Sequence, residues 1–197
     1  MEQLWLKRRS ACATSSWSGG ETTEFFIYPE SASYASRQFS FRFSSATVTQ
    51  PRSTFSMLSG YYRYLIPLDQ PITLHYQGHG SAHLAPLESA AFDGGWTTES
   101  VGACRDFNVM INKSEDWQAN VSVVTDSSSL RCTGLFTGIL ALNESVTVSD
   151  SVGTFSVLLQ CGDFLLLKGK QNETLAIEGE THAGRIIQCT LTQNQQE

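Results

Sequence analysis

The amino-acid sequence predicts an all-β protein, an antiparallel sandwich or barrel, on three observations. Charged residues make up only 16% of its 197 residues, against about 25% in average globular domains. Ser and Thr number 25 and 18, and this composition, together with the aromatic residues, favours sheets and turns over long helices. Short apolar runs recur about every 8–15 residues between Gly, Pro, Asn and Ser, with no 3.6-residue helical period. Such spacing is typical of antiparallel β architectures.

Turn residues separate the expected strands along the chain. Proline cannot donate to a sheet ladder. It follows the first run at Pro29 and the second at Pro51, lies one residue before the end of the third at Pro67 and directly precedes the fourth at Pro71. In the second half, glycine, asparagine and serine separate the runs, and Ile139–Leu142 is too short to assign as a helix. In chain order the expected strands are Glu24–Tyr28, Gln38–Val48, Tyr61–Leu68, Ile72–Tyr76, Arg105–Ile111, Asn120–Thr125, Arg131–Phe136, Ser145–Val148, Thr154–Gln160, Asp163–Leu167, Thr174–Ile177 and Arg185–Thr192.

Two of these strands carry a polar face opposite an apolar one. Successive side chains of a strand point to opposite faces, so in segment 39–44 three phenylalanines share one face and Arg42 lies between two serines on the other. In segment 105–111 the face opposite the apolar one carries Asp106, Asn108 and Met110. A barrel interior is either filled or wet, so each polar face lies outside in solvent or inside around a ligand.

Two arginines lie close to aromatic residues on the expected strands. An unpaired buried charge is very costly, so Arg42 and Arg63 need partners. Either Glu24 and Asp106 pair with them, or the arginines await an anionic ligand, because a guanidinium group matches a carboxylate through two parallel hydrogen bonds.

The overall charge and the cysteine content restrict the class of protein. A net charge of −6 argues against nucleic-acid binding, which needs a basic surface. No apolar stretch approaches the ~20 residues that span a bilayer, and residues 1–17 lack the apolar core of a secretory signal. Five cysteines without a C-x-x-C pair are typical of reduced, mostly buried thiols. We therefore expect a cytoplasmic protein without a nucleic-acid or membrane partner.

Four of the six asparagines lie in N-x-[ST] sequons, and they are Asn112, Asn120, Asn143 and Asn172. The high Ser and Thr content accounts for one or two of them. Without a secretory signal they have no route to glycosylation, and the sequence offers no reason for the excess.

Signals for metal binding and catalysis are weak. Three histidines lie within nine residues, and they are His75, His79 and His83. Glycines inside this segment favour a surface turn over an aligned metal site, so we expect no metal and no cofactor. No G-x-S-x-G elbow or phosphate-binding loop is present in the sequence. Glu21 and Glu24 flank two threonines and could act as an acid–base pair, although glutamates near the start of a strand are usually solvated.

Six short motifs occur in one order along the chain: W-S-G-G-x-T-T-E at Trp17–Glu24, I-Y-P-E at Ile27–Glu30, R-x-F-x-F-R-x-S-S-A at Arg37–Ala46, F-S-x-L-x-G-Y-x-R at Phe55–Arg63, F-D-G at Phe92–Gly94 and R-D-F-N-V-M at Arg105–Met110. In this order they resemble the HutD/Ves family over nearly the whole chain. The resemblance implies a cupin-like fold, which is a double-stranded β-helix or jelly roll. It also implies that residues 1–197 form a single bicupin unit with two barrel-like halves, at about 1–100 and 101–197.

The resemblance also implies a function. Family members are associated with bacterial histidine utilisation as non-catalytic modulators, and typical cupin metal ligands are absent. A small anionic metabolite, urocanate- or formylglutamate-like, is the expected ligand. The candidate ligand-binding residues are those on motif positions, namely Trp17, Glu24, Arg42, Arg63, Asp106 and Asn108.

Two alternatives stay open on the sequence alone. The barrel could house an enzyme, an isomerase or a hydrolase, in which Glu24 or Asp106 acts as general base. The chain could instead be a module that binds a protein partner and has an empty barrel.

Overall fold

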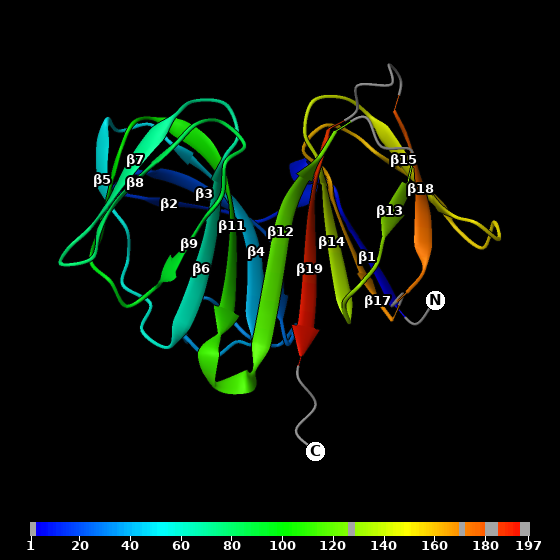
Figure 1. The fold of residues 1–197 in the computed structure, drawn as a ribbon, viewed down its shortest axis with the longest axis horizontal. Coiled ribbons are helices and arrows are strands. Elements are labelled where there is room, and N and C mark those ends of the chain that lie inside the picture. Colours follow the sequence, from blue (N-terminus) through cyan, green and yellow to red (C-terminus); the bar gives the residue numbers. More distant parts are fainter. Residues whose placement is uncertain (1–2, 126–128, 170–171, 180–184, 194–197) are drawn as a thin grey trace. The chain divides into compact units, whose positions relative to one another are not determined.

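The structure is a computed structural model that describes residues 3–125, 129–169, 172–179 and 185–193. Its regular elements there are β-strands, apart from two short 3-10 turns, Arg9–Ala11 (η1) and Lys113–Glu115 (η2). The predicted all-β class is therefore confirmed (Figure 1). Within the described residues, no helix is long and apolar enough to cross a membrane.

The chain divides into two compact units, and residues 12–117 form the first, which we call the N-terminal barrel. Its two sheets consist of antiparallel pairs. The six-stranded sheet has the order β2 (Thr14–Trp17), β3 (Gly20–Tyr28), β4 (Phe41–Val48), β11 (Cys104–Asn112), β6 (Tyr61–Pro67) and β9 (Ala90–Asp93). The four-stranded sheet has the order β5 (Arg52–Thr54), β10 (Thr98–Val101), β7 (Ile72–Tyr76) and β8 (Gly80–Leu84).

Residues 1–11 and 118–197 make up the second unit, the C-terminal barrel. Its five-stranded sheet has the order β1 (Gln3–Lys7), β17 (Phe164–Lys168), β14 (Phe136–Ala141), β19 (Ile186–Gln193) and β12 (Trp117–Val124). Its four-stranded sheet has the order β13 (Ser129–Arg131), β18 (Thr174–Gly179), β15 (Val146–Asp150) and β16 (Ser156–Leu159). Both sheets contribute to one apolar core that includes Ile139, Val148, Leu165 and Leu175. The interior of this barrel is therefore mainly apolar, although Thr137 and Thr190 are buried on the same face.

The interior of the N-terminal barrel is different, because it contains two apolar clusters and a set of polar side chains. One cluster includes Phe55, Leu65 and Leu74, and the other includes Tyr61 and Met110. The polar faces of β4 and β11 are buried rather than exposed to solvent. Of the two positions that the sequence allowed for these faces, the structure has the interior one.

A β-bulge in β3 places two successive phenylalanines on the same apolar face of the sheet. The register between β3 and β4 shifts between Glu24 and Phe26, and the extra residue breaks the two-residue period. As a result Phe25 and Phe26 are both buried, and their rings lie near Phe107 and Phe41 respectively. The side chain of Glu24 lies on the same face as those of Arg42 and Ser44 on β4.

The structure differs from the sequence-based expectation, or adds to it, in four respects. The N-terminal strand β1 pairs with β17, so the division of the chain does not follow the expected halves at residue 100. Arg131–Phe136 is not one strand, because it contains the end of β13, an irregular stretch and the start of β14. Ile139–Leu142 lies largely in β14. The sequence-based list also omits the short strands β1, β2, β5, β8, β9 and β10.

Candidate functional site

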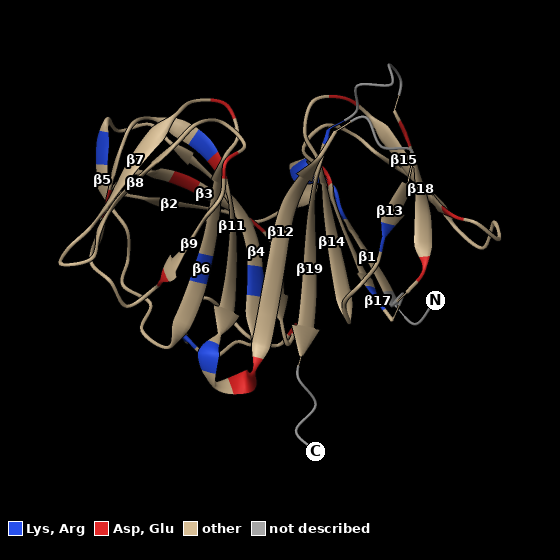
Figure 2. Ribbon diagram, in the orientation of Figure 1, with Lys and Arg blue, Asp and Glu red and all other residues tan. Residues whose placement is uncertain are grey.

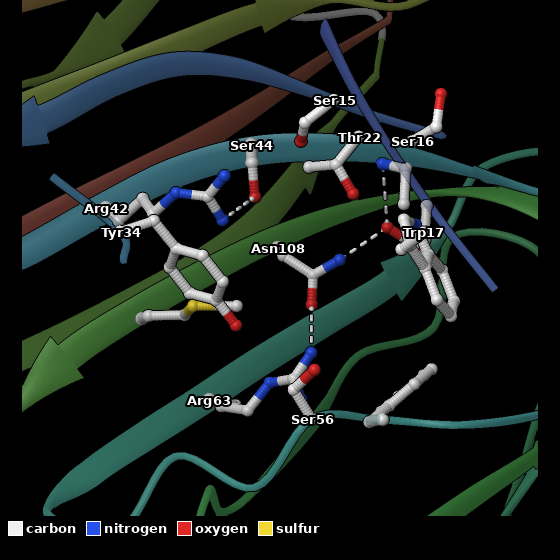
Figure 3. A pocket seen from close by; sticks show the side chains of 14 residues that line it. Ser15, Ser16, Trp17, Thr22, Tyr34, Arg42, Ser44, Ser56, Arg63 and Asn108 are labelled. Atoms are coloured by element: carbon white, nitrogen blue, oxygen red, sulfur yellow. Dashed lines mark hydrogen bonds between the residues drawn. The ribbon is translucent and has the colours of Figure 1, made fainter. Parts of the chain in front are cut away.

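A cavity of about 280 Å³ lies in the N-terminal barrel (Figure 3). This volume is just below the ~300–1,000 Å³ of typical ligand pockets, so it suits a small metabolite. Its lining is Ser15, Ser16, Trp17, Thr22, Tyr34, Arg42, Ser44, Ala46, Phe55, Ser56, Arg63, Asp106, Asn108 and Met110.

The strand register brings the polar groups together. Met110 of β11 lies opposite Arg42 of β4 on one side and opposite Arg63 of β6 on the other, so the two arginines flank one methionine on the same face. Figure 2 shows a basic position on each of β4 and β6. Two residues further along the pleat, Asn108 lies opposite Ser44. Alternation along the three strands therefore directs these side chains into one space.

Arg63 is the buried cation of the cavity, with 7% of the residue exposed. Its Nη2 donates to Asn108 Oδ1 at 3.3 Å, and its guanidinium carbon lies 4.7 and 5.4 Å from the ring centroids of Phe55 and Phe92. Its Nε is buried and has no hydrogen-bond partner. Among the described residues, no Asp or Glu forms an ion pair with Arg63. Burial lowers its pKa from the ordinary value, because desolvation disfavours the charged form.

Arg42 is also buried, but it has a carboxylate partner. Its Nε donates to Glu24 Oε2 at 2.6 Å, and its Nη1 donates to Ser44 Oγ at 3.1 Å. Its guanidinium lies 4.4 Å from the ring centroid of Tyr34, whose ring also lies 4.0 Å from the guanidinium of Arg37. The charge of Arg42 is therefore balanced before any ligand binds, whereas that of Arg63 is not balanced by direct pairing.

Asp106 and Asn108 complete a polar chain from Arg63. The amide Nδ2 of Asn108 donates to Asp106 Oδ1, and its Oδ1 accepts from Arg63. Asp106 Oδ1 also accepts from the backbone N–H of Ala46 at 3.1 Å. Burial raises the pKa of Asp106 to about 7, against an ordinary ~3.9. The charge of Arg63 and these two hydrogen bonds oppose that shift, and burial exceeds them.

Glycines of the motifs allow close approach around Trp17. A Cβ at Gly19 would overlap the indole ring of Trp17, and a Cβ at Gly20 would overlap the carbonyl oxygen of Thr47. Gly20 thus lets β3 approach Thr47 of β4 closely, and Gly19 leaves room for the indole that lines the cavity. The indole Nε1–H of Trp17 is buried without a hydrogen-bond partner, which makes it a second unused donor.

Five of the six candidate ligand-binding residues meet in this cavity: Trp17, Arg42, Arg63, Asp106 and Asn108. The sixth, Glu24, does not line it and instead pairs with Arg42. Sequence reasoning missed Tyr34, which lies between strands in an irregular segment without a period. It also missed Phe55 and Met110, although both fall inside the quoted motifs.

Fold and cavity together define a cupin-like protein of two barrels, one of which has a polar interior. The chain belongs to the HutD family, whose model matches residues 9–184. A conserved protein of unknown function from Pseudomonas aeruginosa PAO1 has a similar structure, with a TM-score of 0.85, 22% identity and coverage of 97% of this chain and 100% of that one. HutD from Pseudomonas fluorescens SBW25, described under a formate condition, is similar with a TM-score of 0.78, 22% identity and coverage of 98% and 100%.

A more distant neighbour introduces the question of a metal. The bacterial pirin YhhW from Escherichia coli, in complex with nickel(II), matches with a TM-score of 0.62, 9% identity and coverage of 95% and 98%. No curated protein matches the sequence. These structural similarities show the cupin-like fold of the chain.

The residues of this cavity do not fit a metal ion. Nickel and similar ions bind histidine and cysteine readily, and the lining contains neither. Its one carboxylate, Asp106, lies near the charge of Arg63. Over the described ranges, no three His, Cys, Asp or Glu side chains form a group that could hold a metal. His83 contacts Thr73 at 3.0 Å and His79 stacks on Trp96, while His182 lies outside the described residues.

Proposed function

We propose that the protein binds a small carboxylate metabolite, urocanate- or formylglutamate-like, in the cavity of the N-terminal barrel. We further propose that it acts in the cytoplasm, without turning the ligand over, as a modulator of histidine utilisation or a related catabolic or stress response. Membership of the HutD family motivates the pathway. Cys104 and Cys189 are buried thiols outside any disulfide, which supports a reducing compartment.

One observation carries the ligand class, and it is the state of Arg63. A buried guanidinium is stable only with good partners, and Arg63 has one long hydrogen bond and an unused Nε–H. A carboxylate in the cavity would accept two parallel hydrogen bonds from it. The hydroxyl groups of Ser15, Ser16, Thr22, Ser44 and Ser56, also in the lining, supply further hydrogen-bond donors for an anion.

A thermal-shift screen of carboxylates tests the proposal. A ligand present at 100 times its Kd adds about 2.7 kcal/mol to the stability of the folded state, which is roughly 5–11 °C of Tm for a chain of this size. We expect such a shift with urocanate, N-formyl-L-glutamate or a near analogue. Arg63→Met should abolish it, whereas Arg52→Met, the same change at an exposed arginine of the same barrel, should preserve it. No shift with any carboxylate would contradict the proposal.

A second candidate is turnover in the same cavity with Asp106 as general base. The observation in its favour is the pKa of about 7, because a general base works best when its pKa lies near the working pH. Glu24, the other candidate base, is engaged by Arg42 and lies outside the lining. Mass spectrometry of the ligand after hours of incubation separates the two candidates. Consumption of the metabolite by the wild-type chain, but not by Asp106→Asn, would favour the enzyme.

A further inference from the structure

Asp106 has one carboxyl oxygen, Oδ2, that no described residue uses as a hydrogen-bond acceptor. The two hydrogen bonds that its side chain accepts end on Oδ1, from the N–H of Ala46 and from the amide of Asn108. Asp106 lines the cavity with only 2% of the residue exposed. Its Oδ2 is therefore the place where this carboxyl group can hold a proton, and a protonated Oδ2 can donate to a bound acceptor.

While Asp106 is ionised, charge inside the barrel is balanced only when the cavity has no ligand. Glu24 balances Arg42, and the negative charge of Asp106 acts on Arg63. A bound carboxylate adds a negative charge that no further described cation of the lining offsets. An uncompensated buried charge is costly, so one of the two carboxyl groups must become neutral. Asp106 is the better proton acceptor, because its pKa of about 7 exceeds that of an ordinary carboxylic acid, ~4.

We propose that the cavity takes up a carboxylate together with one proton from solvent, and that Asp106 holds this proton on Oδ2 and donates it as a hydrogen bond toward the ligand. This inference rests on the proposed function. It adds that affinity is linked to pH, and that the preferred ligand has a hydrogen-bond acceptor at the Asp106 end and a carboxylate at the Arg63 end. For a monocarboxylate, binding is then neutral in charge overall.

Several charged or titratable groups act on Asp106 from the neighbouring elements. The charge of Arg63 on β6 lowers its pKa, and that of Asp69, in the connection after β6, raises it. Cys104, on the same strand, has a pKa raised to about 12, so it remains a neutral thiol. Arg42 on β4 and Tyr34 in the segment before β4 line the same cavity as Asp106, and Glu24 on β3 pairs with Arg42.

The direction in which ligand affinity changes with pH follows from the protonated and ionised forms of Asp106. Below pH 7 the carboxyl group is already protonated in the free protein, so binding needs no proton and affinity is constant. Above pH 7 the free protein is ionised and each binding event takes up a proton. The Kd then rises, approaching tenfold per pH unit, until the pH reaches the raised pKa of the complex.

Isothermal titration calorimetry between pH 6 and pH 9 tests this inference. The probes are N-formyl-L-glutamate and the monoanion butyrate, whose carboxylates stay ionised throughout this range; urocanate is avoided because its imidazole titrates near pH 6.5. Two buffers with different ionisation enthalpies count the protons. We expect uptake near zero at pH 6 and close to one at pH 8.5. Asp106→Asn keeps both acceptor contacts of Oδ1. This variant should bind each probe with the same Kd at every pH and should take up no proton on binding.

Matched controls separate this inference from the proposed function. Glu21→Gln changes an exposed carboxylate of the same sheet and should keep the wild-type pH profile. Binding with the same Kd at pH 6 and pH 9, or equal proton uptake by Asp106→Asn, would overturn the linkage and leave the proposed function standing. Binding of neither probe at any pH would overturn both.

Discussion

Replacement of Arg63 by methionine tests whether this arginine serves the fold or a ligand. The change removes a hydrogen bond to Asn108 at 3.3 Å, worth about 1 kcal/mol, and contacts of the guanidinium with the rings of Phe55 and Phe92, worth roughly 0.5–2 kcal/mol. It also removes the desolvation penalty of a buried cation without a carboxylate partner, which is several kcal/mol per ion. Methionine retains most of the apolar stem. We therefore expect the ligand-free variant to be as stable as the wild type or up to about 3 kcal/mol more stable.

Urea unfolding monitored by tryptophan fluorescence measures this difference in the free energy of unfolding. The same variant should lose the whole Tm shift that the carboxylate ligand produces in the wild type. A structural ion-pair member behaves in the opposite way, because removal of one partner of a buried pair costs about 3–5 kcal/mol. A loss of more than about 2 kcal/mol in Arg63→Met would refute the reasoning, whether or not binding is also lost. Arg52→Met, at an exposed site, should change stability by less than about 1 kcal/mol.

Three further substitutions give independent checks. The folded-state pKa of Asp106, about 7, exceeds the unfolded value of ~3.9, so the folded chain binds more protons between these values and stability decreases as pH rises through that window. Asp106→Asn should therefore gain stability relative to the wild type between pH 5 and pH 8 in urea unfolding, and an unchanged difference would argue against the raised pKa. Glu24→Gln leaves the buried Arg42 without its carboxylate and should lower the free energy of unfolding by about 1–3 kcal/mol, which chemical denaturation measures. The loss is smaller than for a fully buried pair because the Glu24 side chain is 30% exposed. Trp17→Phe deletes an indole N–H that has no partner, so the free protein should lose under about 1 kcal/mol, while calorimetry should show Kd raised about two- to thirteenfold, the value of one hydrogen bond to the ligand.

Alternation along the chain predicted much of the fold because the relevant signal is local. The polar and apolar faces of segments 41–44 and 105–111 follow from a two-residue period, and these segments lie on strands β4 and β11. Phe39 precedes β4 and packs in the cluster of Tyr61 and Met110 instead. The strand β1 was not predicted, because its five residues carry no turn markers and its partner β17 lies about 160 residues away in the chain. Non-local pairing leaves no periodic trace in a short segment.

The composition of the site was predictable in part. Alternation shows that Arg42 and Asn108 lie on polar faces, but it does not show whether a second sheet covers those faces, since the pleat is the same in either case. The order of short motifs supplied five of the residues that line the cavity, namely Trp17, Arg42, Arg63, Asp106 and Asn108. Neither source could place Tyr34, which reaches the cavity from an irregular segment. Its position depends on the tertiary contacts of its ring with two arginines.

In the sequence Arg42 and Arg63 look alike, and the strand register explains why only one of them has a carboxylate partner. β4 is paired with β3, and that pairing brings Glu24 within reach of Arg42. On β6 the residue directly opposite Arg63 is Phe92 of β9. The acidic residue next to it, Asp93, lies opposite Tyr62 instead, and because neighbouring positions on a strand face opposite ways, its carboxylate pairs with Lys113.

A shift of one residue in the β6–β9 register would place Asp93 opposite Arg63 and give the arginine an internal partner. The observed register instead gives it an aromatic ring, which contacts the guanidinium without neutralising its charge. The Gly94 that follows holds this arrangement, since a Cβ there would come within 2.7 Å of the carbonyl oxygen of Leu58 and 3.4 Å of Arg63 Cδ. The F-D-G motif thus keeps Arg63 buried, positioned and without an ion-pair partner, which is the state that an anion-binding group requires.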